Sequence, residues 1–165
     1  MFNTSIRYHD TTLYCDDIPV TEIAEKCGTP TYIYSLPRII QNYRHIKSSF
    51  VDLDTHIHFS AKANANHTIL ETLVSNGAGI DAVSGGEIYR ALKAGAKSEN
   101  IVFAGVGKTY EELHFAIEQC VGWINVENIA ECQYINDIAD QLKKSPIKIA
   151  LRLNPNVTAN THPYI

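Results

Sequence analysis

The sequence predicts an α/β protein in which short parallel strands alternate with helices. Five short apolar runs begin at residues 56, 79, 101, 123 and 147, so that successive strands start 22 to 24 residues apart. Between these runs, apolar residues recur every three or four positions, which is the spacing of a helix with one buried face. Regular β-α alternation implies crossover connections between parallel strands, in either an open doubly wound sheet or a barrel.

The elements of this series follow one another from residue 37 onward. A helix is expected over residues 37–50, where Ile39, Tyr43 and Ile46 share a face. The expected strands are residues 56–61, 79–83, 101–104, 123–126 and 147–153. Each of the four intervals between these strands is expected to hold one amphipathic helix.

Two of the expected helices carry a capping box at their start, in which Ser or Thr is followed three residues later by Glu. The pairs are Ser84 with Glu87 and Thr109 with Glu112. These pairs predict helices that begin directly after residues 84 and 109.

Residues 1–35 show a different pattern from the rest of the chain. Strand-like segments at residues 13–15 and 31–34 flank a short predicted helix at residues 20–27, and a turn is predicted at Gly28-Thr29-Pro30. We therefore expect this segment to belong to a separate sheet. A complete eight-stranded barrel has about 250 residues, so that five strands followed by the end of the chain indicate an incomplete barrel.

The composition is that of an ordinary soluble globular protein, with 45% apolar and 19% charged residues and a formal charge of −4. There is no apolar run of the ~18 residues that span a bilayer and no block of Lys and Arg typical of nucleic-acid binding. The four cysteines are widely spaced, which predicts neither a zinc site nor disulfides and favours a cytoplasmic location. Cys120 and Cys132 are expected to be core residues of two helices.

Lys62 is the first candidate for chemistry, because it comes at the end of the first strand of the series. In parallel α/β proteins the functional groups gather at the carboxyl ends of the strands, where the loops converge. Apolar walls at such a place favour the neutral form of a lysine. A neutral amine can form a Schiff base with an aldehyde such as that of pyridoxal phosphate. A solvated surface lysine is the alternative interpretation.

Asp81 and Glu87 are further candidates, on the second strand and just beyond it. Asp81 interrupts an apolar strand, where a carboxylate is costly unless it is paired. Arg152, in the fifth strand, is a plausible partner for it. Glu87 completes a capping box with Ser84, and whether it also has a role in a site stays open.

Two other patterns point to different chemistry. His56 and His58 alternate on the first strand, so that both imidazoles could face one metal ion in a metal-dependent barrel hydrolase, although core histidines are the preferred interpretation. The segment 105–109 is similar to the end of a phosphate-binding P-loop. The full P-loop pattern needs a glycine where Val102 stands, which argues against nucleotide hydrolysis.

The segment Phe59-Ser60-Ala61-Lys62-Ala63-Asn64 resembles the pyridoxal-phosphate attachment signature of the family that holds ornithine, arginine and diaminopimelate decarboxylases. These are fold-type III enzymes related to alanine racemase. Ser60 departs from the family pattern, which usually has Ala or Pro there. Four more stretches resemble the family, the last of them in a form typical of its diaminopimelate branch: residues 28–35, 79–87, 101–108 and 151–165.

The resemblance implies a fold and a cofactor. Residues 36–165 are expected to form part of a (β/α)8 barrel of the alanine-racemase-like type, and residues 1–35 to join a C-terminal-type β domain. Lys62 is expected to be catalytic and to bind pyridoxal 5′-phosphate covalently. The residues expected around the cofactor are Asp81, Glu87 and Arg152, and His162 is expected near the substrate.

The resemblance also implies an activity, which is decarboxylation of meso-2,6-diaminopimelate to L-lysine and CO2 in lysine biosynthesis. The expected partners are a small amino-acid substrate and a second copy of the chain in a cytoplasmic homodimer, with no nucleic acid and no membrane. The family's phosphate-binding and cross-dimer residues have no counterpart in residues 1–165, so that we expect an N-terminal fragment that is inactive alone. A non-catalytic barrel that binds pyridoxal phosphate is the alternative from another functional class.

Overall fold

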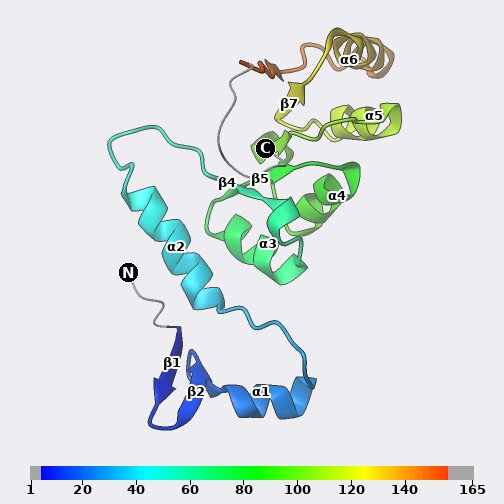
Figure 1. The fold of residues 1–165 in the computed structure, drawn as a ribbon. Helices are drawn as coiled ribbons and strands as arrows, with labels where there is room; N and C mark the ends of the chain where they lie inside the picture. The colour runs from blue at the N-terminus through cyan, green and yellow to red at the C-terminus, as the bar shows by residue number, and fades with distance from the viewer. Residues whose placement is uncertain (1–4, 156–165) are drawn as a thin grey trace. The chain divides into compact units, whose positions relative to one another are not determined.

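The computed structural model describes residues 5–155 of the 165-residue chain. The chain consists of two compact units, Met1–Ile57 and His58–Ile165, whose residues contact one another mainly within each unit. The elements of both units are drawn in Figure 1. Within the described residues, no helix is both long enough and apolar enough to cross a membrane.

The first unit contains a small antiparallel sheet and two helices. Its strands pair in the order β1-β2-β3. The elements are β1 (Ile6–His9), β2 (Thr12–Cys15), β3 (Ile18–Pro19), α1 (Val20–Cys27) and α2 (Leu36–Ser48). The start of α2 is fixed by Ser35, whose hydroxyl oxygen accepts a hydrogen bond from the N–H of Arg38 and whose hydroxyl donates to Asp16 just after β2.

The separate sheet, the short helix at 20–27 and the helix near 37–50 are all present as predicted, with two differences. The segment 31–34 is not a strand, because it pairs with no other segment of residues 5–155 and its tyrosines are exposed, Tyr32 by 90%. Conversely, β1 was not predicted. All four of its residues are exposed, although Ile6 and Tyr8 alternate with polar residues as in a strand.

The second unit is a parallel sheet of five strands whose order in the sheet follows the order in the chain, β4-β5-β6-β7-β8. A doubly wound sheet reverses its strand order at a switch point, whereas this sheet does not. The order therefore supports the barrel alternative. The strands are β4 (His58–Ser60), β5 (Gly79–Ala82), β6 (Ile101–Phe103), β7 (Trp123–Val126) and β8 (Ile149–Leu151).

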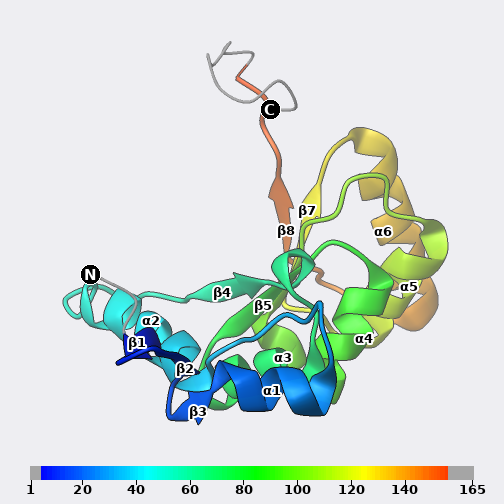
Figure 2. The same cartoon turned by 60° about the horizontal axis from the view of Figure 1, so that its bottom comes forward.

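The helices of this unit connect successive strands and lie on the same side of the sheet (Figure 2). They are α3 (His67–Ser75), α4 (Gly85–Lys93), α5 (Tyr110–Glu118) and α6 (Ile129–Leu142), with short 3-10 turns η1 (Ala61–Ala63) and η2 (Ser98–Asn100). Both predicted capping boxes mark the true helix starts. Thr109 and Glu112 exchange both bonds of the box, and the hydroxyl of Ser84 accepts from the N–H of Glu87.

The core lies between the sheet and these helices. Ile80 and Phe103 on the strands are fully buried, as are Ile88 on α4 and Leu113 on α5. Burial of each such side chain contributes about 1.5–3 kcal/mol. Because side chains alternate along a strand, Asp81 lies on the face opposite to Ile80 and escapes this apolar layer, which is how an apolar strand accommodates a carboxylate.

Cys120 is not the core residue that the helical pattern predicts. Helix α5 ends at Glu118, and Cys120 follows in a left-handed conformation with φ of 57°, with its side chain exposed. The apolar spacing continues past the true helix end, which is why the pattern misplaces it. Cys132 on α6 is half-buried and packs against the core.

Candidate active site

Polar contacts join neighbouring strand ends along the carboxyl edge of the sheet, beginning with β4 and β5. Ser60 and Asp81 are paired in register, and the hydroxyl of Ser60 donates a hydrogen bond of 2.7 Å to Oδ2 of Asp81. The carboxylate of Asp81 is half-buried. Ser60, the residue that departs from the attachment signature, therefore orients the carboxylate that the sequence singled out.

Glu112 makes the next link, between the loops that follow β5 and β6. One carboxylate oxygen accepts from the N–H of Gly85 at 2.9 Å and the other from the N–H of Thr109 at 3.1 Å. The hydrogen bond from Gly85 is the main cause that lowers the pKa of Glu112, and burial opposes it. The backbone and hydroxyl of Thr109 and the charge of Lys108 lower this pKa further.

Lys108 and Glu131 link the loop after β6 to the start of α6. Nζ of Lys108 lies 3.5 Å from Oε2 of Glu131, and the lysine side chain has no exposed surface. The same oxygen accepts a hydrogen bond of 2.8 Å from the N–H of Glu127, directly after β7. The amide oxygen of Asn128 caps α6 by accepting from the N–H of Glu131.

Glu127 and Arg152 complete the series at the ends of β7 and β8. Nη1 of Arg152 lies 3.1 and 3.3 Å from the two carboxylate oxygens of Glu127. The expected pairing of Arg152 with Asp81 is therefore wrong. β6 and β7 separate β5 from β8 in the sheet, whereas Glu127 follows the strand next to β8. Arg152 also lies just beyond its strand rather than within it.

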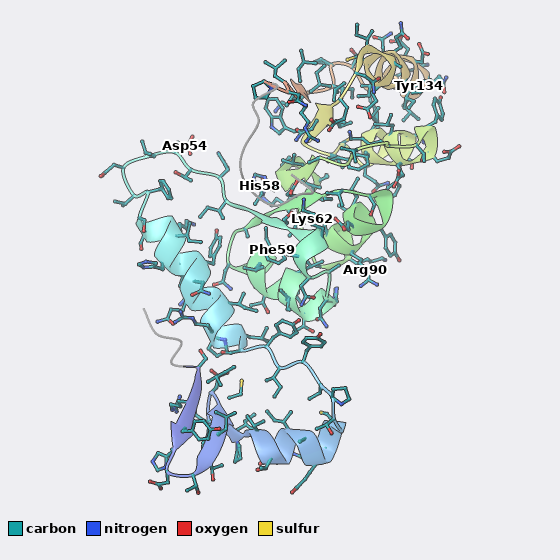
Figure 3. The ribbon with its side chains drawn as sticks, in the orientation of Figure 1. Asp54, His58, Phe59, Lys62, Arg90 and Tyr134 are labelled. Atoms are coloured by element: carbon teal, nitrogen blue, oxygen red, sulfur yellow. The ribbon has the colours of Figure 1, made fainter. Side chains whose placement is uncertain are left out.

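Lys62 lies in the 3-10 turn η1, directly after β4 (Figure 3). Its side chain is exposed, so that the expected apolar walls do not surround it within residues 5–155. The reason is its place in the sheet, because among the described residues β4 has a neighbouring strand on one side only. Within the same residues its amine takes part in no hydrogen bond and no ion pair, which leaves it free to react.

Glu87 acts within the loop that opens α4. Its Oε2 accepts a hydrogen bond of 2.9 Å from the N–H of Val83, while its own N–H donates to Ser84. Ser84 therefore caps α4 as predicted, but the return bond of the capping box is replaced by the bond from Val83. His162 lies outside the described residues.

The two histidines do not form a metal site. β4 begins at His58, so that His56 is not on the strand, and its Nε2 lies 3.7 Å from Asp54 instead. In the described part of the chain, no three His, Cys, Asp or Glu side chains are grouped to hold a metal ion. The hypothesis that both imidazoles face one metal ion required a strand that begins at residue 56.

Four charged residues of this edge were not recognised as site residues: Lys108, Glu112, Glu127 and Glu131. The sequence held a signal for some of them. Glu112 belongs to a predicted capping box, and Asn128 stands three residues before Glu131, which is the same spacing with Asn as the capping residue. The pairing of Lys108 has no such local signal, because its partner is 23 residues away on another helix.

Replacing Glu112 by Gln is expected to lower the free energy of unfolding by about 1 kcal/mol at pH 7, the usual loss for a helix cap. The folded pKa of Glu112 is lowered, so that its contribution is present above the unfolded value of about 4.3 and disappears as the pH falls through the folded value. Urea unfolding at pH 7 and at pH 3 measures this difference. The difference between the two proteins should be smaller at pH 3 than at pH 7, and an equal difference at both would contradict the assignment.

Comparison with known proteins identifies the same family that the sequence motifs resemble. Residues 36–165 match the family described as "Pyridoxal-dependent decarboxylase, pyridoxal binding domain". Diaminopimelate decarboxylase of Neisseria meningitidis serogroup A is 40% identical over 154 residues, which are 93% of this chain and 38% of that protein. Diaminopimelate decarboxylase of Aquifex aeolicus is 41% identical over 164 residues, which are 99% of this chain and 38% of that protein.

A solved structure shares the fold. The diaminopimelate decarboxylase of m. jannaschii, in complex with L-lysine, superposes with a TM-score of 0.89 at 37% identity, over 99% of this chain and 39% of that one. This chain thus spans well under half the length of the relatives it matches.

Proposed function

The chain belongs to the pyridoxal-dependent decarboxylases, whose pyridoxal-binding domain it contains, and from this premise we propose that its protein decarboxylates meso-2,6-diaminopimelate to L-lysine and CO2. The observation that carries the proposal is a free lysine amine at the carboxyl end of a parallel strand, within a chain about 40% identical to diaminopimelate decarboxylases. A relative of the same fold was solved with L-lysine, which is the proposed product.

Pyridoxal 5′-phosphate is the proposed cofactor, and the chemistry of the residues at this edge fits it. An aldehyde needs an amine that is not engaged elsewhere, and Lys62 has such an amine within residues 5–155. Asp81 lies on the adjacent strand, where Ser60 fixes the direction of its carboxylate. When bound, the cofactor supplies an electron-accepting ring that takes up the electron pair left by the departing carboxylate.

The residues of the chain would position the reactants and manage charge. Lys62 would hold the cofactor through a covalent carbon–nitrogen bond and carry protons to and from the substrate amine. Asp81 and Arg152 are proposed to orient the cofactor and its lysine, from the ends of β5 and β8. Glu87 is proposed to contribute by fixing the loop after β5 through its bond to Val83. His162 is proposed to contact the substrate.

The setting of the reaction is also a proposal. We expect a cytoplasmic homodimer, and the four cysteines agree with a reducing compartment because all of them are free thiols. Residues 1–35 are proposed to join a β domain, and the small antiparallel sheet and α1 lie within residues 6–27 of this segment.

Borohydride reduction of the whole protein, rather than of residues 1–165 alone, in the presence of pyridoxal phosphate tests the proposal. Reduction should fix a pyridoxyl group on Lys62, located by mapping the peptides, and meso-2,6-diaminopimelate should release CO2 in a parallel assay. A label at Lys62 without CO2 release would favour a non-catalytic binding protein. No label at Lys62, or a label spread over many lysines, would refute the proposed function.

A further inference from the structure

Lys108 is a buried cation that the proposed reaction does not use. Its side chain has no exposed surface, and its Nζ forms no hydrogen bond within the described residues. The ammonium group lies between the face of the Phe103 ring, 5.4 Å from its centroid, and Oε2 of Glu131 at 3.5 Å. The cation–π contact with the ring and the ion pair with the carboxylate offset the free-energy cost of removing water from the ammonium group.

The charge of Lys108 affects a second contact of Glu131, which is its hydrogen bond to the backbone of Glu127. Oε2 of Glu131 also accepts the N–H of Glu127, and its own N–H is held by Asn128. Glu131 is itself buried, with 8% of its side chain exposed. A buried carboxylate without a counter-ion would become neutral or move toward water. Lys108 therefore supplies the opposite charge beside the Glu131 carboxylate, at the place from which Glu131 holds the backbone of Glu127.

The link continues from Glu127 to Arg152. Both carboxylate oxygens of Glu127 contact the Arg152 guanidinium, whose side chain is otherwise 59% exposed. An exposed arginine has many side-chain conformations, and a fixed carboxylate restricts them. The direction of Arg152 at the end of β8 thus depends on where Glu127 is held, and through it on Glu131 and Lys108.

We propose that Lys108 is a positioning residue, which acts through Glu131 and Glu127 to set the Arg152 guanidinium at the carboxyl edge of the sheet. The effect on the cofactor rests on the proposed function, in which Arg152 orients pyridoxal phosphate. The effect on Arg152 itself does not, and it can be measured without cofactor.

The test uses the double variant Lys108→Met/Glu131→Gln. A single replacement of Lys108 would leave the Glu131 carboxylate buried without a partner and could unfold the protein. The double variant removes both charges and leaves the N–H of Glu127 with the neutral amide oxygen of Gln, which is a weaker acceptor than the carboxylate and therefore restrains Glu127 less. The control is Tyr110→Phe, which removes the bond of 3.1 Å from Tyr110 on α5 to Gln141 on α6, a contact that includes none of Lys108, Glu131, Glu127 and Arg152.

The first measurement is the rate at which phenylglyoxal, an arginine-specific reagent, modifies Arg152, followed by peptide mapping. We expect about a threefold faster modification in the double variant, because a less restrained Glu127 protects the guanidinium less. The Tyr110→Phe control should react like the unchanged protein. Equal rates in all three proteins would overturn the proposal, whether or not the protein binds pyridoxal phosphate.

The second measurement is the dissociation constant for pyridoxal phosphate, from absorbance titration. The double variant should bind about tenfold more weakly, the order of loss seen when a group that orients a ligand-binding residue is removed. In an Arg152→Ala background the same two replacements should change the dissociation constant no further, while their effect on urea unfolding persists. A tenfold loss in both backgrounds would mean that Lys108 does not act through Arg152. Absence of binding by the unchanged protein would instead refute the proposed function and leave the labelling result to decide on Lys108.

Discussion

Replacing Lys62 by Ala is expected to abolish covalent capture of pyridoxal phosphate and to lower decarboxylation by on the order of 10²–10⁴-fold, the contribution of a positioned group that transfers protons. No other residue at the carboxyl ends of β4 and β5 offers an amine, since Ser60 and Asp81 carry a hydroxyl and a carboxylate. The loss should therefore be complete for the covalent label and large for turnover.

The Lys62→Ala protein is expected to be about as stable as the unchanged protein, so that a loss of activity can be attributed to the missing amine. Lys62 is exposed and has no partner within residues 5–155, so that its replacement should change the free energy of unfolding by less than about 0.5 kcal/mol. A loss of activity would then be chemical rather than structural. The matched control is Lys93→Ala on α4, whose ammonium lies over the exposed Tyr89 ring and which should keep both the label and the activity.

Labelling and turnover in the Lys62→Ala protein are measured by borohydride reduction and CO2 release. A small amine such as methylamine, added at high concentration, should restore part of the turnover, because it supplies the missing nucleophile. Undiminished labelling of the variant would place the reactive amine elsewhere.

The elements of the barrel unit were predictable because they rest on local patterns. The strand 123–126 was found with its observed bounds, and the capping pairs located the starts of α4 and α5. The predicted ends of the strands were less accurate, and one of these errors led to the hypothesis of a metal site. The expected strand start at residue 56 placed His56 beside His58, whereas β4 begins two residues later.

The partners of the charged residues depend on the arrangement of the strands in space. Arg152 was a plausible partner of Asp81 because neighbouring strands inside a barrel can bring such residues together. In a sheet ordered as the chain is ordered, the strand beside β8 is β7, and the acidic residue directly after β7 is Glu127. A stricter use of the predicted barrel topology would have identified this pair from the sequence.

The surroundings of Lys62 and Lys108 were not predictable in the same way. Position at a strand end suggested apolar walls around Lys62, but burial depends on what lies on both sides of β4, and within residues 5–155 only β5 lies beside it. Lys108, by contrast, looked like part of a phosphate-binding loop and is buried against Phe103. Sequence patterns give the location of a lysine along the chain more readily than the packing around its side chain.

Replacing Gly122 by Ala is expected to destabilise the barrel unit by about 3 kcal/mol, at the upper end of the usual cost of an added methyl group in a packed site. A Cβ at this position would lie 2.1 Å from the carbonyl oxygen and 2.7 Å from the carbonyl carbon of Glu99. These are backbone atoms of η2, so that no side-chain rotation relieves the clash. The N–H of Gly122 also donates to the carbonyl of Ser98, which holds the two segments together at 2.9 Å.

The clash at Gly122 has to be relieved by moving η2 away from the segment that enters β7, and this should disturb β6 as well, because η2 leads directly into it. Gly86→Ala is the matched control. Gly86 lies in an exposed position of α4, where a Cβ would meet no atom closer than 3.8 Å, and alanine is a better helix former than glycine by roughly 0.5–1 kcal/mol. Urea unfolding should therefore show a large loss for Gly122→Ala and none for Gly86→Ala. Equal stability of the two variants would mean that η2 can move away from Gly122 at little cost in free energy. The close approach of these two backbone segments would then not be what holds the amino ends of β6 and β7 together.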